Sequence, residues 1–77
     1  MLFLFQRIPV QKFKIRDKFI QLNQLIKAIG WVENGAQANA IIDKGLVKVN
    51  GVVEHRKRNK LIAGSKVEFD GNLVIIE

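Results

Sequence analysis

The first clear pattern of apolar and polar positions predicts a helix that begins near residue 22. Apolar residues recur at the spacing that puts one buried stripe along a helix: Leu22, Leu25, Ile26 and Ile29. Gly30 follows at the place where a residue in the left-handed conformation ends many helices. The helix should therefore end at this glycine.

A second helix is expected in the next segment, ENGAQANAIIDKGL. Asn34 is a suitable N-cap, and Gln37 three residues later makes a variant of the capping box. Gly45 ends the segment as Gly30 ends the first helix. The apolar residues between them line one face: Ala38, Ile41 and Ile42. Only WVENG separates the two helices, so they should form a compact pair.

After Gly45 the period of the apolar positions changes from that of a helix to that of a strand. LVKVNGVVE alternates around Asn50-Gly51, a strong signal for a hairpin because both residue types accept a positive φ. KVEFDGNLVIIE predicts a second hairpin around Asp70-Gly71. A basic loop, residues 55–60, would connect the two hairpins.

The N-terminal part is harder to interpret. QKFKIRDKF alternates apolar and charged residues, which predicts a strand that joins the sheet. MLFLFQRIPV is compatible with an edge strand, an extension or a mis-assigned start codon. We therefore expect residues 1–17 to be an extension or edge strand and residues 18–77 to be the domain. The expected fold class is α+β, with two packed N-terminal helices against a small, mostly antiparallel twisted sheet built from two hairpins.

Composition limits what this domain can be. Its 77 residues, 48% of them apolar, provide for one small core, and without cysteine neither a disulfide nor a thiolate metal site can add to it. No segment approaches the ~18 apolar residues of a membrane span. MLFLF is too short for the apolar part of a signal peptide and has no basic residues before it. We expect a soluble, cytoplasmic monomer that does not bind membranes.

The formal net charge of +6 is high for so short a chain and favours polyanionic partners. The charge is most concentrated in the predicted loop: Arg56, Lys57, Arg58 and Lys60. These residues could be a solvated connection. However, a connection between hairpins needs few residues, and neighbouring cations repel one another. Arginine also forks onto phosphate oxygens, which lysine meets as a point charge, so we interpret the cluster as a phosphate-binding surface.

Other candidates for the same surface have alternative explanations. Lys48 precedes the Asn-Gly turn and could be an ordinary exposed strand residue, while Lys44 also suits the end of a helix dipole. Gly35 and Gln37 open the second helix, where free N–H groups attract phosphate, although Gln37 has a capping role as well. Trp31 is expected to pack against the core rather than stack on a base.

A further basic run in the N-terminal segment is expected to act as a charged edge strand that blocks aggregation: Lys12, Lys14, Arg16 and Lys18.

The chain lacks the residues of common catalytic and metal sites. His55 is the only histidine and Ser65 the only serine, tyrosine is absent, and no carboxylates are paired at a suggestive spacing. We therefore expect no enzyme activity, no catalytic residue, no metal, no cofactor and no small-molecule substrate.

Most of the chain, from about residue 18 to 70, resembles a known family. The features are the first helix with its leucine stripe, GW, GAQA, GLVKVNG, the E-x-R-K-R loop and AGSKVEF. Together they are similar to the S4 RNA-binding domain, named for a small-subunit ribosomal protein, and especially to its short, free-standing bacterial members of the YbcJ type. The resemblance implies two helices packed against a small twisted sheet. It also implies binding to structured RNA, ribosomal or transfer RNA, through the helix pair and adjoining loops.

Two arginines common in that family are absent here. Many members begin the first helix with Arg-Leu-Asp and carry Ser-Arg at the second, where this chain has Gln21-Leu22-Asn23 and Asn34-Gly35-Ala36. The positive charge lies instead in the loop. The residues expected to bind RNA are Arg56, Lys57, Arg58, Lys60, Lys48, Lys44, Gln37 and Gly35. The alternative functions are a ribosome-associated protein or assembly adaptor whose charge only steers it, and a duplex-DNA binder.

Overall fold

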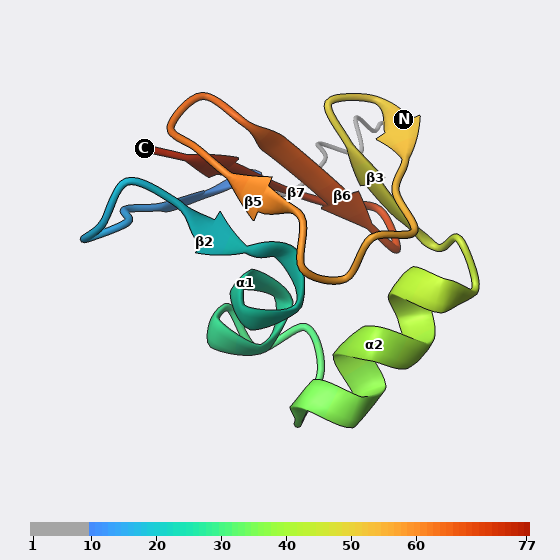
Figure 1. The fold of residues 1–77 in the computed structure, drawn as a ribbon. Helices are drawn as coiled ribbons and strands as arrows, with labels where there is room; N and C mark the ends of the chain where they lie inside the picture. The colour runs from blue at the N-terminus through green and yellow to red at the C-terminus, as the bar shows by residue number, and fades with distance from the viewer. Residues whose placement is uncertain (1–9) are drawn as a thin grey trace, which may run out of the picture.

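The computed structural model describes residues 10–77. In chain order, the elements are β1 (Val10–Phe13), β2 (Ile20–Gln21), α1 (Leu22–Ala28), α2 (Gly35–Asp43), β3 (Val47–Val49), β4 (Val52–Val53), β5 (Lys60–Leu61), β6 (Lys66–Phe69) and β7 (Asn72–Ile76). Both helices lie on the same side of the sheet (Figure 1). In the described part of the chain, no helix is long and apolar enough to cross a membrane.

The strands form one five-stranded sheet and one short ribbon. The order in the sheet is β1-β7-β6-β3-β4, and all neighbours are antiparallel except β1 and β7, which run parallel. β2 and β5 form a separate antiparallel ribbon in which Ile20 lies opposite Leu61 and Gln21 opposite Lys60. The ribbon leads directly into α1, so it joins the sheet side of the molecule to the helix pair (Figure 1).

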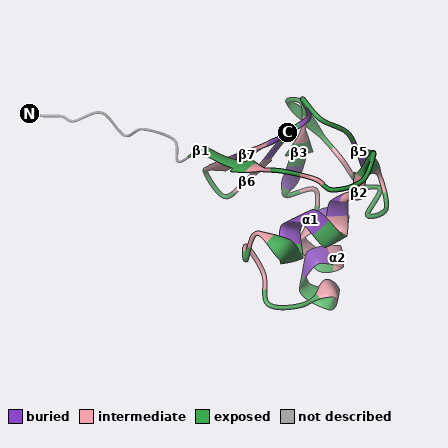
Figure 2. Ribbon diagram, turned by 90° about the vertical axis from the view of Figure 1, so that its left-hand side faces the viewer, coloured by how far each residue is buried: buried purple, intermediate pink, exposed green. Residues whose placement is uncertain are grey.

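The core lies between the helix pair and the sheet (Figure 2). Alternate residues of the strands point into it because side chains along a strand alternate between its two faces. The fully buried apolar residues are Leu22, Leu25, Ile26, Ala38, Ile42, Val47, Leu61, Val67, Val74 and Ile76. The apolar stripes predicted for both helices therefore face this core.

The predicted helix ends are confirmed. After α1, Gly30 has a φ of 81°, its N–H donates to the Lys27 carbonyl at 3.1 Å, and the Trp31 N–H donates to the Ile26 carbonyl at 3.2 Å. These are the two bonds of a Schellman motif, which satisfies carbonyls that the helix leaves without partners. Gly45 ends α2 with the same pair of bonds.

Both predicted hairpins are also confirmed. Asn50 and Gly51 have φ angles of 52° and 84°, as a type I′ turn requires, and they join β3 to β4. Asp70 and Gly71 have φ angles of 52° and 78° and join β6 to β7.

Two parts of the expected fold are wrong. The helices are not N-terminal, because β1 and β2 precede them, and the sheet contains β1 beside the two hairpins. The strand expected in QKFKIRDKF is present only as far as Phe13. Local patterns do not reveal the parallel β1–β7 pair, because Val10 and its partner Leu73 are far apart in the sequence. The interpretations of MLFLFQRIP fall on residues 1–9, outside the described residues.

The type I′ turn gives a first testable prediction: Gly51→Val should lower the thermal unfolding midpoint. A Cβ at Gly51 would meet no other atom within 4 Å, so the cost comes only from the positive φ. A β-branched residue there should lower the free energy of unfolding by about 1–2 kcal/mol. The matched control is Gly35→Ala in α2, where the Cβ also enters open space and φ is not positive. That variant should melt at or above the wild-type temperature. Equal midpoints for Gly51→Val and wild type would contradict the turn assignment.

Candidate functional site

The basic residues of the second half of the chain lie on a loop and on the strand that follows it. We call residues 54–59, between β4 and β5, the basic loop. Arg56, Lys57 and Arg58 belong to it and are exposed. Lys60, expected in a loop of residues 55–60, is instead the first residue of β5. The reason is its pairing with Gln21, a partner that only the folded chain brings close.

The Glu54 carboxylate organises the basic loop. It accepts hydrogen bonds from the Arg56 backbone N–H at 2.9 Å, from Arg56 Nε at 2.9 Å and Nη2 at 3.1 Å, and from Asn59 Nδ2 at 3.2 Å. The two side-chain bonds from Arg56 form a bidentate pair, the stronger geometry for a guanidinium and a carboxylate. The Glu54 side chain is only 14% exposed, whereas that of Arg56 is 75% exposed. Glu54 therefore fixes both ends of the loop and leaves the arginine facing solvent.

The same contacts shift the ionisation of both side chains. The hydrogen bonds from Arg56 hold the pKa of the Glu54 carboxyl below its ordinary value of 4.5, although partial burial opposes this. In turn, the hydrogen bonds to Glu54 raise the pKa of Arg56. At neutral pH the loop thus contains an ionised pair whose carboxylate lies inside and whose cation lies outside.

The backbone of the basic loop covers the start of α1. The Leu22 N–H donates to the Asn59 carbonyl and the Asn23 N–H to the Lys57 carbonyl, both at 2.9 Å. Gln21 at the N-cap makes no side-chain capping bond. The first N–H groups of a helix need partners outside it, and here the loop carbonyls supply them. The loop is therefore attached to the helix as well as to its own strands.

One side-chain contact extends this attachment to α2. Asn23 Nδ2 donates to Asn39 Oδ1 at 3.2 Å, between the first turn of α1 and the middle of α2. The basic loop, the start of α1 and α2 are thus linked by successive hydrogen bonds. These hydrogen bonds hold the loop backbone in place, so the side chains of the loop project from an ordered segment.

The cations surround a shallow, open depression of about 390 Å³, lined by Arg56, Arg58, Asn59 and Lys60. In residues 10–77, the only ion pair is that of Arg56 with Glu54, so Lys57, Arg58 and Lys60 have no carboxylate partner there. The Lys60 ammonium lies 4.8 Å from the centre of the Phe19 ring, within the range of a cation–π contact. The loop and β5 together thus present an accessible positive surface.

The other expected site residues are divided between different places. Lys44 is the C-cap of α2, and the adjacent Gly45 lies against His55, so this end of the helix adjoins the basic loop. Lys48 lies in β3 opposite Glu68, on the sheet face away from the core, and borders a depression that Glu68 and Asp70 also line. Acidic neighbours offset its charge, and the structure does not join it to the loop surface.

Gly35 and Gln37 lie at the start of α2, the end of that helix opposite Lys44 and the loop (Figure 1). The Gln37 N–H donates to Asn34 Oδ1 at 2.9 Å, which confirms the predicted N-cap. Gln37 Oε1 in turn accepts from the Glu33 N–H at 2.7 Å, one residue earlier than in the usual capping box. The side chain of Gln37 is therefore engaged in helix capping.

Trp31 packs against the core, and its ring centre lies 6.0 Å from that of Phe69. In residues 10–77, no group of three or more histidine, cysteine, aspartate or glutamate side chains is placed to hold a metal ion.

Sequence reasoning missed two residues that organise the site. Glu54 was part of the E-x-R-K-R pattern, and its spacing of two residues from Arg56 was the available signal. Phe19 gave no comparable signal, because its contact with Lys60 depends on the β2–β5 ribbon.

Comparison with known proteins gives one consistent result. A family model described as the S4 domain matches residues 13–77. YbcJ from Escherichia coli (strain K12), described provisionally as an RNA-binding protein, is 51% identical over 55 residues, which cover 71% of this chain and 79% of that protein. YbcJ from Shigella flexneri, described as uncharacterized, matches to the same extent. The solution structure of E. coli YbcJ, described as revealing an ALFAL motif involved in RNA binding, superimposes with a TM-score of 0.64 at 38% identity. That comparison covers 99% of this chain and 95% of the other.

The role of Glu54 in the loop predicts that Glu54→Gln lowers the unfolding midpoint at pH 7. A group whose pKa is lowered in the folded state adds stability above its unfolded pKa of about 4.5, and this is lost as the pH falls through the folded value. The difference in midpoint between variant and wild type should therefore shrink as the pH falls below 4.5.

The matched control for this measurement is Glu77→Gln, which removes an exposed carboxylate that forms no ion pair in the described residues. It should change the midpoint little at either pH. A Glu54→Gln difference that is the same at pH 7 and pH 3 would show that the charge of this carboxylate does not hold the loop.

Proposed function

This chain belongs to the S4 domain family, and from that premise we propose that it is a small RNA-binding protein that docks on structured RNA. The RNA class we propose is ribosomal or transfer RNA, and the contact surface is the basic loop with the adjoining strand β5. The protein acts by binding, without catalysis and without a cofactor, as a monomer in the bacterial cytoplasm.

The observation that carries this proposal is the fixed geometry of the basic loop. Glu54 and the start of α1 hold its backbone by the hydrogen bonds described above, while Lys57 and Arg58 stay exposed. A surface that is already ordered loses less conformational freedom when it binds, so more of the interaction energy contributes to affinity.

Arg56 remains suited to phosphate although it is paired with Glu54. A guanidinium has five N–H donors, and Glu54 receives bonds only from Nε and Nη2. The remaining donors are available to a phosphate oxygen, and the carboxylate holds the plane of the guanidinium in one orientation. We assign Arg56, Lys57, Arg58 and Lys60 to the phosphate contacts, with Lys44 at the border of the same surface.

The form of the surface supports recognition of shape and charge. A-form RNA hides its base edges in a deep, narrow major groove and displays its phosphates, so an open cationic depression suits its backbone. The similarity to YbcJ, described provisionally as an RNA-binding protein, points to the same class of partner. The role of a ribosome-associated adaptor whose charge only steers it remains the alternative, and the loop variants below distinguish the two.

Salt dependence is the first test of this function. If about four cations displace counterions from RNA, the affinity for a folded RNA such as unfractionated transfer RNA should fall with a log–log slope of about −3 to −4. This corresponds to a loss of roughly a hundredfold between 50 and 200 mM salt. An affinity that hardly changes with salt would exclude phosphate contacts as the main interaction.

The second test removes the cations of the basic loop. The triple variant Arg56→Gln, Lys57→Gln and Arg58→Gln should weaken RNA binding by roughly several-fold to a hundredfold and flatten the salt slope by about 2 to 3 units. Its unfolding midpoint, measured in parallel, separates loss of contacts from any loss of the Arg56–Glu54 pair.

The control triple is Lys12→Gln, Lys27→Gln and Lys66→Gln, which removes the same charge from exposed positions outside the basic loop. This control variant should lower the affinity for RNA much less than the loop triple variant does. Equal losses from both triples would mean that a diffuse positive field attracts RNA and that the loop has no special role.

A further inference from the structure

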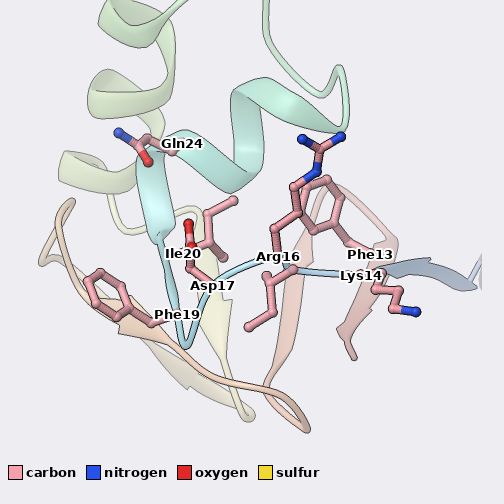
Figure 3. A pocket seen from close by; sticks show the side chains of 8 residues that line it. Phe13, Lys14, Arg16, Asp17, Phe19, Ile20 and Gln24 are labelled. Carbon is pink, nitrogen blue, oxygen red and sulfur yellow. The ribbon is translucent and has the colours of Figure 1, made fainter.

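Residues from the end of β1 to the first turn of α1 form an open pocket of about 270 Å³. Its lining includes Phe13, Arg16, Asp17, Phe19, Ile20 and Gln24. In Figure 3, Phe19 lies on one side of the pocket and Phe13 and Arg16 lie on the other, with Asp17 and Ile20 between them. None of these residues belongs to the phosphate surface assigned above.

One contact across the β2–β5 ribbon links this pocket to the cationic surface. Ile20 lies opposite Leu61 and Gln21 opposite Lys60, so Phe19, the residue before β2, lies close to the start of β5. The Lys60 ammonium is 4.8 Å from the centre of the Phe19 ring and does not itself line the pocket. Phe19 therefore lies between the Lys60 ammonium and the pocket that its ring helps to line.

The chemistry of the lining fits one nucleotide. Phe19 is 40% exposed, which leaves an aromatic ring accessible to solvent beside the Lys60 ammonium. Aromatic rings stack on unpaired bases, and Arg16 adds a cation to the lining of the pocket. Asp17 and Gln24 supply polar groups for the edge of a base. The volume lies below the ~300–1,000 Å³ of pockets for larger ligands, which favours a single base.

We propose that this pocket receives one unpaired base of the RNA bound on the basic loop, with the base stacked on Phe19. The inference rests on the proposed function and adds a preference to it: the protein selects structured RNA with an extruded nucleotide over a continuous duplex. Phosphate contacts on the loop set the general affinity, and the pocket sets this selection.

The test compares two RNA stems that differ only in one bulged nucleotide. Wild-type protein should bind the bulged stem roughly 5- to 50-fold more tightly than the fully paired stem, as stacking of one base provides. Phe19→Leu keeps an apolar side chain but removes the ring, so its affinity for the bulged stem should fall to that for the paired stem. Loss of the ring also removes the contact with Lys60, which should lower the affinity for both stems alike, so the ratio of the two affinities reports the pocket.

Two further variants make the result specific. Phe19→Tyr retains a ring that can stack and should keep the preference for the bulged stem. Ile62→Ala truncates another apolar side chain, 61% exposed and not in the pocket lining, and should also keep the preference. Unfolding midpoints of all three variants confirm that each is folded at the assay temperature.

The outcomes separate this inference from the proposed function. If wild type binds both stems equally, with the salt dependence given above, the function stands and the pocket proposal is overturned. If the preference for the bulge survives Phe19→Leu, the bulge is recognised by its shape, and the proposal is again overturned. If wild type binds neither stem nor transfer RNA, the proposed function fails and this inference fails with it.

Discussion

The attachment of the basic loop to the first turn of α1 is the interaction on which the site depends. Helix α1 has no side-chain N-cap, so its Leu22 and Asn23 N–H groups use the carbonyls of Asn59 and Lys57. Glu54 closes the same loop from the other side by binding Arg56 and Asn59. A segment that must satisfy buried backbone groups cannot move freely, and its cations are held in place as a consequence.

The basic loop touches the helix pair through hydrogen bonds from the first turn of α1. Its positive charge therefore lies beside the helices and not on a separate part of the molecule. Lys44 borders that surface through the contact of Gly45 with His55. Gly35 lies at the far end of α2, where the side chains of Asn34 and Gln37 cap the helix.

The elements that the sequence predicted correctly are those with a local physical cause. Gly30 ends α1 and Asn50-Gly51 turns β3 into β4 because a positive φ is required within a few residues of a clear periodic pattern. The parallel pairing of β1 with β7 and the two-residue strands β2 and β5 have no such pattern, because two residues cannot show an alternation. The cations of the site could be identified from the sequence because they are clustered in it. The contact of Phe19 with Lys60 could not, because it depends on the β2–β5 pairing, and the separation of Lys48 and Gln37 from the loop likewise depends on the folded chain.

The most direct test of whether the basic loop binds RNA is a map of backbone amide chemical shifts during titration with a folded RNA. If the basic loop is the contact surface, the largest changes fall on residues 54–60 and on Leu22 and Asn23, whose N–H groups bind the loop carbonyls. Small changes are expected around Lys48 on the opposite face of the sheet. Changes concentrated around Lys48 or at the start of α2, with the basic loop unaffected, would contradict it.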